Sequence, residues 1–389
     1  MNMELLRDEF IKMYGDKPEK TFIYFSPGRV NLIGEHTDYN GGYVFPCALS
    51  YGTYLVIRKI RKNRIKFAST NFDFRISVDL EQIDQKQGNQ WINYPLGVLN
   101  EFVKSGIKLT GLEMLFSGNV PNGAGLSSSA SIEIVTAFAV NDLFNAGLNG
   151  VEMAKLGQRA ENHFVGVNCG IMDQFASSMG KKDAAIFLNC DTLEYEHVPV
   201  KLNNYKLVIS NTNKRRGLAD SKYNERRSEC EKAVEYLSNV RKINNLGELS
   251  PDEFQQLMGS IKEENVLKRA KHVVSEIKRT KDAVKELQAG NLKKFGELMN
   301  GSHDSLRDDY EVTGIELDTL VEEARKIPGV IGSRMTGAGF GGCTVSLVKE
   351  DQVGRFIKEV GENYAAKTGL QADFYVAEIG EGARKVSEF

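Results

Sequence analysis

The spacing of apolar residues separates a strand-rich part of the chain from a helix-rich part. Residues 3, 6, 10 and 14 are apolar at helical spacing, which predicts a surface helix at the N-terminus. After it, β-branched and aromatic runs separated by clusters of Gly, Asn, Asp or Lys predict strands as far as about residue 120. The expected strands span residues 22–26, 51–60, 64–70, 74–80 and 112–118.

From Ser127 onward the apolar residues follow helical spacing, and good helix formers replace the β-branched runs. Residues 218–299 are helical in pattern and highly charged, which marks a shift in composition. The last ninety residues return to a mixed pattern, with strands around another helix. The expected helices span residues 127–144 and 150–166, and the expected strands 184–189, 205–210, 342–348 and 372–379.

The length of the chain predicts two domains. Its 389 residues exceed what one hydrophobic core usually supports. The shift in composition places the boundary near residue 200, so we expect an N-terminal domain at 1–200 and a C-terminal domain at 201–389. We find no internal repeat and no low-complexity linker, which favours two closely packed halves.

Charge and composition exclude several classes of function. Apolar residues make up 41% of the chain and charged residues 26%, a balance typical of soluble globular proteins. Fifty basic and 52 acidic side chains leave a formal net charge of -2. No general electrostatic attraction to nucleic acid or to an anionic membrane follows from such a balance, and we expect neither as a partner.

The cysteines and the N-terminus indicate a cytoplasmic protein. The N-terminal stretch carries acidic residues where a signal peptide would have a basic end and an apolar core. No apolar run approaches the ~20 residues of a membrane-spanning helix. The cysteines are odd in number and widely spaced, as expected of reduced thiols. They are Cys47, Cys169, Cys190, Cys230 and Cys343.

A Gly- and Ser-rich loop at 120–131, "VPNGAGLSSSAS", is a candidate anion site. Gly123 and Gly125 allow the backbone to approach a ligand, and the following helix would direct free N–H groups towards it. The simpler alternative is a glycine turn with a serine N-cap. The loop is not a Walker A motif, because it lacks the Gly-Lys-Ser/Thr sequence.

A second Gly-rich run spans residues 332–348, "GSRMTGAGFGGCTVSLV". Gly337, Gly339 and Gly342 have the spacing of a dinucleotide fingerprint, but the run leads into an expected strand where that motif should open a helix. Two alternatives stay open. The run either packs against the first loop and closes a nucleotide pocket, or it forms a tight turn.

The stretch "GEHTDYNGG" brings Glu35, His36 and Asp38 together before a glycine turn. A turn with a capping aspartate is the simplest interpretation. Zinc is disfavoured because the three residues lack the spacing of a helix-borne histidine pair, and the other histidines stand in unrelated contexts. Sugar recognition is the sharper hypothesis, since clustered carboxylates and an imidazole can take paired hydrogen bonds from neighbouring hydroxyls.

Three further residues are candidates for chemistry. Asp173 lies in the apolar segment "GIMDQF", where an acid is either a cap, a buried structural residue or a catalytic carboxylate. Arg29 could pair with it and neutralise charge on a phosphoryl group. Tyr223 lies in a helix whose bases and acids interleave as on a solvated face, and its phenol could face a cleft between the halves.

Taken together, these motifs resemble those of the GHMP small-molecule kinases, in order and approximate spacing, and "PGRVNLIGEHTDYNGG" resembles the galactokinase signature. The resemblance spans residues 22 to about 348. It implies an α+β fold of two domains with the active site in the cleft between them, and an unusual left-handed β-α-β crossover in the first. It also implies ATP-dependent phosphorylation of the C1 hydroxyl of α-D-galactose to galactose 1-phosphate, the entry step of galactose catabolism.

The resemblance further implies a role for each motif residue, with ATP, D-galactose and Mg²⁺ as the small molecules and a monomer as the expected state. Asp173 would accept the proton and Arg29 would stabilise the transition state. The sugar would contact Glu35, His36, Asp38 and Tyr223; ATP would contact Ser69, Gly123, Ala124, Gly125, Leu126, Ser127, Ser128 and Ser129; and Ser129 with Glu161 would hold the metal ion.

Alternatives remain at this point. An arginine paired with Asp173 would lower the pKa of this carboxylate and weaken it as a base, so its alternative role is mainly to orient the nucleophilic hydroxyl. The substrate could be N-acetylgalactosamine or another sugar. A third alternative is a galactose sensor of the same family, which works as a transcriptional partner and resembles a galactokinase with a shortened serine-rich loop; this sequence keeps "GLSSSASIE" intact.

Overall fold

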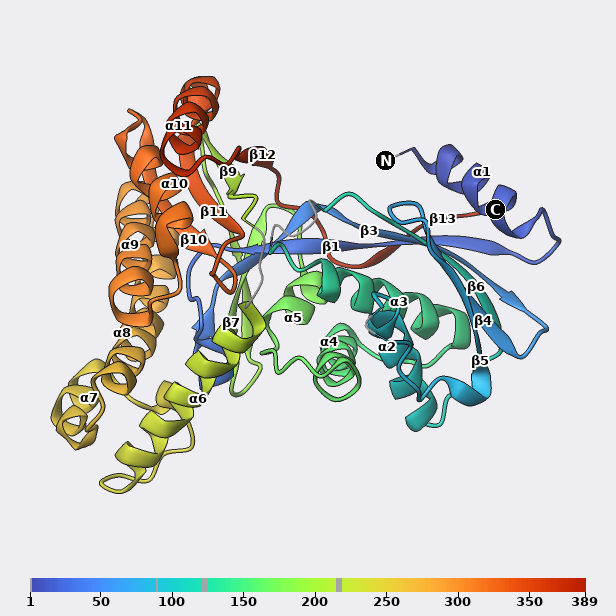
Figure 1. Ribbon diagram of the computed structural model, residues 1–389, viewed down its shortest axis with the longest axis horizontal. Helices are drawn as coiled ribbons and strands as arrows, with labels where there is room; N and C mark the ends of the chain where they lie inside the picture. Colours follow the sequence, from blue (N-terminus) through green and yellow to red (C-terminus); the bar gives the residue numbers. More distant parts are fainter. Residues whose placement is uncertain (1, 89, 121–124, 215–218) are drawn as a thin grey trace.

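The computed structural model describes residues 2–88, 90–120, 125–214 and 219–389. Figure 1 shows one half built around a long twisted sheet and a second half of upright helices beside a smaller sheet. The C-terminus lies next to the N-terminal helix (Figure 1), where the Arg7 guanidinium lies 5.0 Å from the centre of the Phe389 ring. Among the described residues, no helix is long and apolar enough to cross a membrane.

The first half is a six-stranded sheet with helices on both faces. Alternation along its strands decides the packing: Val56 and Leu115 share a core with Phe10 of the N-terminal helix, whereas Leu55 and Met114 point to the opposite core. The strand order is β13-β1-β3-β6-β4-β5, with β1 at Thr21–Asn31, β3 at Pro46–Ile60, β4 at Arg64–Ser69, β5 at Arg75–Asp79, β6 at Gly111–Gly118 and β13 at Arg384–Glu388.

The helices of the first half lie mostly below the sheet in the view of Figure 1, with α1 on the other side. The helix expected at 150–166 is in fact an α-helix followed by the π-helical turn Ala160–Val165. Sequence reasoning did not find α2 or α5. The helices are α1 at Met3–Tyr14, α2 at Asn93–Lys104, α3 at Ser128–Phe144, α4 at Gly150–Arg159 and α5 at Met172–Met179.

Strands β4 and β6 run parallel and are joined through β5 and α2. This connection is the crossover that the sequence resemblance implies; its left hand stays a prediction. The first sheet does not follow a simple division of the chain, because β13, the last strand of the chain, pairs antiparallel with β1 of the N-terminal half. The domain boundary at residue 200 stays a prediction.

The second half packs long helices against a four-stranded sheet. In Figure 1, α8 and α9 stand side by side next to β10 and β11. The sheet order is β10-β11-β9-β12, with β9 at Tyr205–Asn211, β10 at Val330–Thr336, β11 at Cys343–Lys349 and β12 at Asp373–Ala377. The helices are α6 at Ala219–Ser238, α7 at Pro251–Leu257, α8 at Glu264–Gln288, α9 at Leu292–Ser305, α10 at Gly314–Lys326 and α11 at Val353–Thr368.

A small sheet, β2-β7-β8, lies between the two halves, with β7 against β3 and β8 against α8. One hydrophobic core contains side chains from both halves: Phe45 and Ala185 of the first half pack in one cluster with Ile209 and Phe295 of the second. This shared core holds the two halves together at the level where β1 ends. Its strands are β2 at Tyr43–Val44, β7 at Ala184–Asn189 and β8 at Tyr195–Pro199.

Candidate active site

A cleft of about 420 Å³ lies where the end of β1, the serine-rich loop, α5, α6 and the second Gly-rich run meet. Ser69 and Leu126 are not among its described lining residues, and Gly123 and Ala124 lie outside the described residues. The expected site residues that do line the cleft are Arg29, Glu35, His36, Asp38, Gly125, Ser127, Ser128, Ser129, Glu161, Asp173 and Tyr223.

Arg29 and Asp173 form a two-pronged ion pair at the centre of the cleft. Arg29 Nε and Nη2 each donate to one oxygen of Asp173 at 2.8 Å, and Nη1 donates to the Gly125 carbonyl at 2.8 Å. Arg29 is 4% exposed, and the Asp173 carboxylate raises its pKa against the opposing effect of burial. The positive charge of Arg29 therefore persists in the cleft, and the planar fork fixes the orientation of both side chains.

The serine-rich loop touches this pair directly. Ser127 sits just before α3 in the left-handed backbone region, with φ 57°, and its hydroxyl donates to Asp173. The Arg29 backbone N–H donates to the Leu126 carbonyl at 3.1 Å, and the Leu126 side chain is buried in a hydrophobic core cluster. The N-terminal end of α3 thus opens beside the Arg29–Asp173 pair, as an anion site requires.

Glu35 is buried, and one of its carboxylate oxygens is fully engaged. Oε1 accepts hydrogen bonds from Gly337 N at 2.8 Å, Thr336 Oγ1 at 3.1 Å and Arg334 Nη1 at 3.3 Å. These donors come from β10 and the Gly-rich run that follows it. Oε1 is therefore fixed by the second half of the molecule, which leaves the other oxygen to meet a ligand in the cleft.

The second Gly-rich run connects β10 to β11, so it opens a strand and is not a dinucleotide fingerprint. Its Gly337 lies so near the first loop that a Cβ there would come within 3.2 Å of the Gly125 carbonyl. The run thus packs against the first loop, one of the two alternatives that the sequence left open. Whether it closes over a nucleotide stays a prediction.

His36 has an unusual backbone and a buried ring. Its φ is 61°, and its side chain lies among Tyr39, Tyr223 and Tyr310, with ring centroids 4.7 Å apart for the Tyr310 pair. Burial lowers the pKa of His36 to about 3, against a partly opposing effect of the Ala338 backbone. The imidazole is therefore neutral at physiological pH. Within the described ranges, no group of three or more aspartates, glutamates, cysteines or histidines is placed to hold a metal ion.

Asp38 begins the short 3-10 turn Asp38–Asn40, so the turn expected in "EHTDYNGG" is present. The Thr37 hydroxyl donates to the Gly34 carbonyl at 3.0 Å and to the Tyr43 carbonyl at 2.8 Å, which closes the turn. Burial, and next the Asp173 charge, raises the pKa of Asp38 to about 7. A ligand that forms a hydrogen bond with this buried carboxyl group would stabilise it.

This raised pKa predicts how stability depends on pH. Below about 3.8, the ordinary pKa of aspartate, Asp38 is protonated in both the folded and the unfolded chain. Between that value and about 7 the unfolded chain releases its proton while the folded chain holds it, so Asp38 lowers the free energy of unfolding as the pH rises. Asp38→Asn removes this contribution.

We therefore expect the thermal midpoint of Asp38→Asn to exceed that of the parent protein by a margin that grows from pH 4 to pH 7 and then stays constant. Differential scanning calorimetry of both proteins across this range measures the margin. Other titrating groups, Glu161 included, are shared by the two proteins and cancel in the difference. A margin that does not change with pH would contradict the prediction.

Because Gly170 has no side chain, the Asp38 carboxylate can occupy the space beside it. A Cβ at Gly170 would come within 1.8 Å of Asp38 Oδ2. Gly170→Ala is expected to displace this carboxylate and to raise the KM for the sugar by about 10- to 100-fold, the effect of losing one charged hydrogen bond. Steady-state kinetics with ATP held saturating measures it.

The control is Gly354→Ala on α11, where a Cβ would meet nothing within 4 Å. It should leave the KM for the sugar unchanged. Equal KM values in Gly170→Ala and in the parent protein would show that the Asp38 carboxylate does not contact the sugar.

Glu161 is buried in the π-helical turn and belongs to a crowded acidic cluster. Its Oε2 accepts from Gln174 Nε2 at 2.6 Å, and the same nitrogen donates to Glu133 Oε2 at 2.9 Å. Burial and the neighbouring negative charges raise the pKa of Glu161, while a hydrogen bond from Ser129 lowers it. Glu133 Oε1 is buried with no partner among the described residues. Such a cluster would be stabilised by a cation.

Ser69 ends β4, and its hydroxyl accepts from Asn71 N at 3.0 Å. It does not come together with the cleft residues, and its expected contact with a nucleotide stays a prediction. Tyr223, by contrast, projects from α6 into the cleft, with its ring 5.4 Å from that of Tyr39. Its helix is otherwise a charged, solvated one, as expected.

Sequence reasoning missed several residues of the cleft. Tyr39 follows the sugar motif directly and bonds His36, yet its "DYNGG" context indicates only a turn. Gly170 carries no signal beyond a glycine beside "IMDQF". Tyr94 and Asn224 line the cleft from α2 and α6, and only the packing of these helices brings them there.

Three family models match the chain. The galactokinase galactose-binding signature matches residues 8–59, the GHMP kinases N terminal domain matches residues 93–181, and the GHMP kinases C terminal model matches residues 283–366. The first covers the sugar motif, the second covers the serine-rich loop with Glu161 and Asp173, and the third covers the second Gly-rich run.

Full-length relatives carry the same name. The chain is 54% identical over 387 residues to a galactokinase of Clostridium tetani, covering 99% of this chain and 98% of that protein. It is 58% identical over 367 residues to a galactokinase of Fusobacterium nucleatum, covering 93% and 94%.

The fold is also that of solved structures. The structure of Lactococcus lactis galactokinase complexed with galactose matches with a TM-score of 0.97 and 48% identity, over 99% of this chain and 100% of that one. A mevalonate kinase matches with a TM-score of 0.62 at 22% identity, which shows the shared fold alone. The α+β two-domain GHMP fold expected from the motifs is confirmed, and the chain belongs to the galactokinase family of the GHMP kinases.

Proposed function

We propose that the cleft transfers the γ-phosphoryl group of ATP to the C1 hydroxyl of α-D-galactose, with the residues below in named roles. Membership of the galactokinase family makes the chain a sugar kinase, and galactose 1-phosphate and ADP are the products of this activity. The observation that supports our placement of the reaction is the Arg29–Asp173 fork between the serine-rich loop and the sugar motif.

Asp173 is proposed to accept the proton of the C1 hydroxyl or to orient this hydroxyl. Arg29 is proposed to stabilise the charge on the phosphoryl group during its transfer. Phosphoryl transfer passes through a loose transition state, so catalysis consists mainly of positioning and charge stabilisation. The fork holds both oxygens of Asp173 in place, and Arg29 Nη1 ties the same guanidinium to the Gly125 carbonyl of the loop. One side chain thus aligns the acceptor carboxylate with the loop.

The sugar is proposed to lie against Glu35, His36, Asp38 and Tyr223. Of these, Glu35 presents an anchored carboxylate, His36 a neutral imidazole, and Asp38 a carboxyl group with a raised pKa. Each group suits a sugar hydroxyl, which can donate and accept at once. A wrong epimer would leave one of these buried groups unpaired, which is the physical basis for discrimination.

A divalent ion accompanies ATP in kinases, and we propose Mg²⁺ held by Ser129 and Glu161. The fit rests on the acidic cluster: burial, and next the negative charge of neighbouring carboxylates, raises the pKa of Glu161 and of Glu133, and Glu133 Oε1 is buried without a partner among the described residues. When bound, such an ion would neutralise charge on the phosphates. It would take its remaining ligands from phosphate oxygens and water, as Mg²⁺ usually does.

The test is a panel of sugars in an ATP-consumption assay with purified protein. Galactose-dependent ADP production, with weaker production from glucose, mannose and N-acetylgalactosamine, supports the proposal. A preference for N-acetylgalactosamine would assign a different substrate. Binding of galactose and ATP without ADP production would instead support a sensor.

We also propose that the enzyme works as a monomer in the cytoplasm. None of the five cysteines, all of which the structure describes, forms a disulfide, as suits a reducing compartment. Light scattering at assay concentration tests the monomer.

A further inference from the structure

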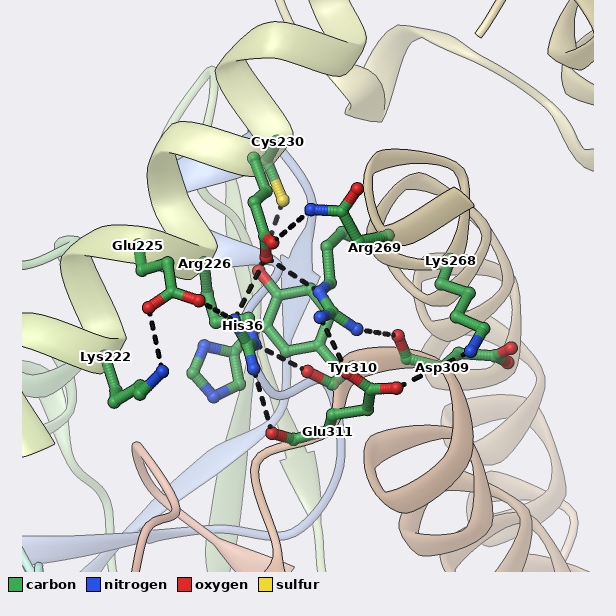
Figure 2. A network of polar contacts seen from close by, with 12 residues as sticks. His36, Lys222, Glu225, Arg226, Cys230, Lys268, Arg269, Asp309, Tyr310 and Glu311 are labelled. Atoms are coloured by element: carbon green, nitrogen blue, oxygen red, sulfur yellow. Dashed lines mark hydrogen bonds and ion pairs between the residues drawn. The ribbon is translucent and has the colours of Figure 1, made fainter. Parts of the chain in front are cut away.

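A chain of hydrogen bonds runs from the sugar motif into the second half of the molecule. His36 Nδ1 lies 2.8 Å from the Tyr39 hydroxyl, which lies 2.8 Å from the Tyr310 hydroxyl, which in turn lies 3.2 Å from Cys230 Sγ. Figure 2 shows the His36 ring beside the Tyr310 ring, with Cys230 above the phenol. Tyr310 and Cys230 are fully buried, so no solvent competes for these bonds.

The donors of this chain can be assigned from chemistry. The Cys230 thiol is both a weak donor and a weak acceptor, so it does not set the direction. The His36 end does: a phenol is a better donor than a neutral imidazole N–H, and a bare imidazole nitrogen is a better acceptor than a phenol oxygen. Tyr39 therefore donates to His36 Nδ1, Tyr310 donates to the Tyr39 oxygen, and the thiol hydrogen points to the Tyr310 oxygen.

This direction decides where the His36 proton lies. The buried ring is neutral and carries one N–H, and which nitrogen bears it depends on the bond that the other makes. Because Nδ1 accepts from Tyr39, the hydrogen must be on Nε2. Nε2 is buried and belongs to a residue that lines the cleft. No described group meets hydrogen-bond geometry with it, although the Ala338 backbone interacts with the ring and raises its pKa.

Tyr310 is held in place by two buried arginines from different helices. Arg226 of α6 donates through Nε to the Tyr310 carbonyl at 2.8 Å and through Nη2 to the Glu311 carbonyl at 3.2 Å. Arg269 of α8 donates through Nη1 to the Asp309 carbonyl at 2.7 Å. Figure 2 shows both arginines converging on this turn. The phenol therefore has little freedom to move away from Tyr39.

We propose that Tyr310 is a positioning residue for the sugar: through Tyr39 it holds His36 as the Nε2–H tautomer, so that Nε2 donates to a hydroxyl oxygen of the substrate. The identity of the substrate in this inference rests on the proposed function, whereas the tautomer of His36 does not. It assigns part of sugar recognition to a residue that touches no substrate and lies in the opposite half of the chain.

The test is Tyr310→Phe, with Tyr39→Phe as a second variant that removes the direct bond to Nδ1. Nitrogen-15 NMR of the imidazoles reports the tautomer, and the protein has only five histidines. The His36 signals are assigned by their loss in His36→Asn. In the parent protein we expect a protonated Nε2 and a bare Nδ1; in both variants we expect a mixture of tautomers.

Kinetics supply the second readout. Both variants should raise the KM for galactose by about 2- to 12-fold, the effect of one neutral hydrogen bond, with kcat and the KM for ATP within about twofold of the parent. The control is Tyr364→Phe, which removes a buried hydroxyl that donates to the Thr212 carbonyl at 2.8 Å outside the cleft. It should destabilise the protein without changing the tautomer or the KM for galactose.

A bare Nε2 in the parent protein, or an unchanged tautomer in both variants, would overturn the inference. If Tyr310→Phe fails to fold, Tyr39→Phe alone decides it. Failure of the proposed function is distinguishable, because a protein that does not phosphorylate galactose still shows its His36 tautomer in the NMR spectrum.

Discussion

Asp173→Asn is expected to lower kcat by about 10²- to 10⁴-fold, the usual contribution of a positioned acid–base group, while galactose binding stays measurable. The carboxylate accepts from Arg29 on both oxygens and from Ser127 on one of them. An amide must turn its NH₂ group towards one of these donors. The variant therefore loses both the proton acceptor and the alignment of the fork, whereas the sugar contacts of the motif around Glu35 remain.

Coupled assay of ADP release measures kcat, and isothermal titration calorimetry measures galactose binding. Asp173 also lies in the first turn of α5, where an acid stabilises the helix. Asp252→Asn, in the first turn of α7, controls for this loss and should leave kcat unchanged. Near-normal turnover in Asp173→Asn would contradict both proposed roles of Asp173, as a base and as an orienting carboxylate.

Arg29→Lys is the second prediction, with an expected loss in kcat of about 10²- to 10³-fold and little change in galactose binding. Lysine keeps the positive charge but has no planar fork. It cannot hold both oxygens of Asp173 and the Gly125 carbonyl at the same time, as Arg29 does. The charge that offsets the transferring phosphoryl group would remain, but it would no longer be fixed in direction.

The matched control is Arg58→Lys. Arg58 is as deeply buried as Arg29, and it bonds a carboxylate and a carbonyl in the same manner, with Nε 2.8 Å from Glu113 Oε2 and Nη2 2.9 Å from the Tyr14 carbonyl. It lies away from the cleft, so its replacement should lower the thermal midpoint without changing kcat. If Arg29→Lys also affects stability alone, Arg29 is a structural residue.

The motifs predicted the parts of the site better than its arrangement. Short polar sequences such as "GEHTD" and "GLSSSAS" can be recognised as candidate binding motifs, because their residue types suit hydroxyls and phosphates. That Glu35 is fixed through Oε1 by the run beginning at Gly337 could not be read from either segment, since the two are about 300 positions apart in the chain. The same holds for Tyr310, which carries no signal in its helical surroundings.

Residue type explains which elements were found. The strands β3, β4 and β6 are rich in β-branched and aromatic residues and α3 is rich in helix formers, and the structure has them close to the expected residues. The helix α5 spans eight residues, too few for a periodic pattern to stand out in its apolar segment. The π-helical turn at Ala160–Val165 differs from an α-helix by one residue per turn, which composition does not reveal.

By itself, the sequence determined the sugar and phosphate motifs, because residue type and spacing are local properties; the resemblance of these motifs to the GHMP kinases then implied the two-domain α+β class and the kind of chemistry. Only the tertiary structure decided that Arg29 grips Asp173 by both oxygens, that β13 returns to the first sheet, and that Tyr310 reaches His36 through Tyr39. These are contacts between distant segments, and they depend on how sheets and helices pack in three dimensions.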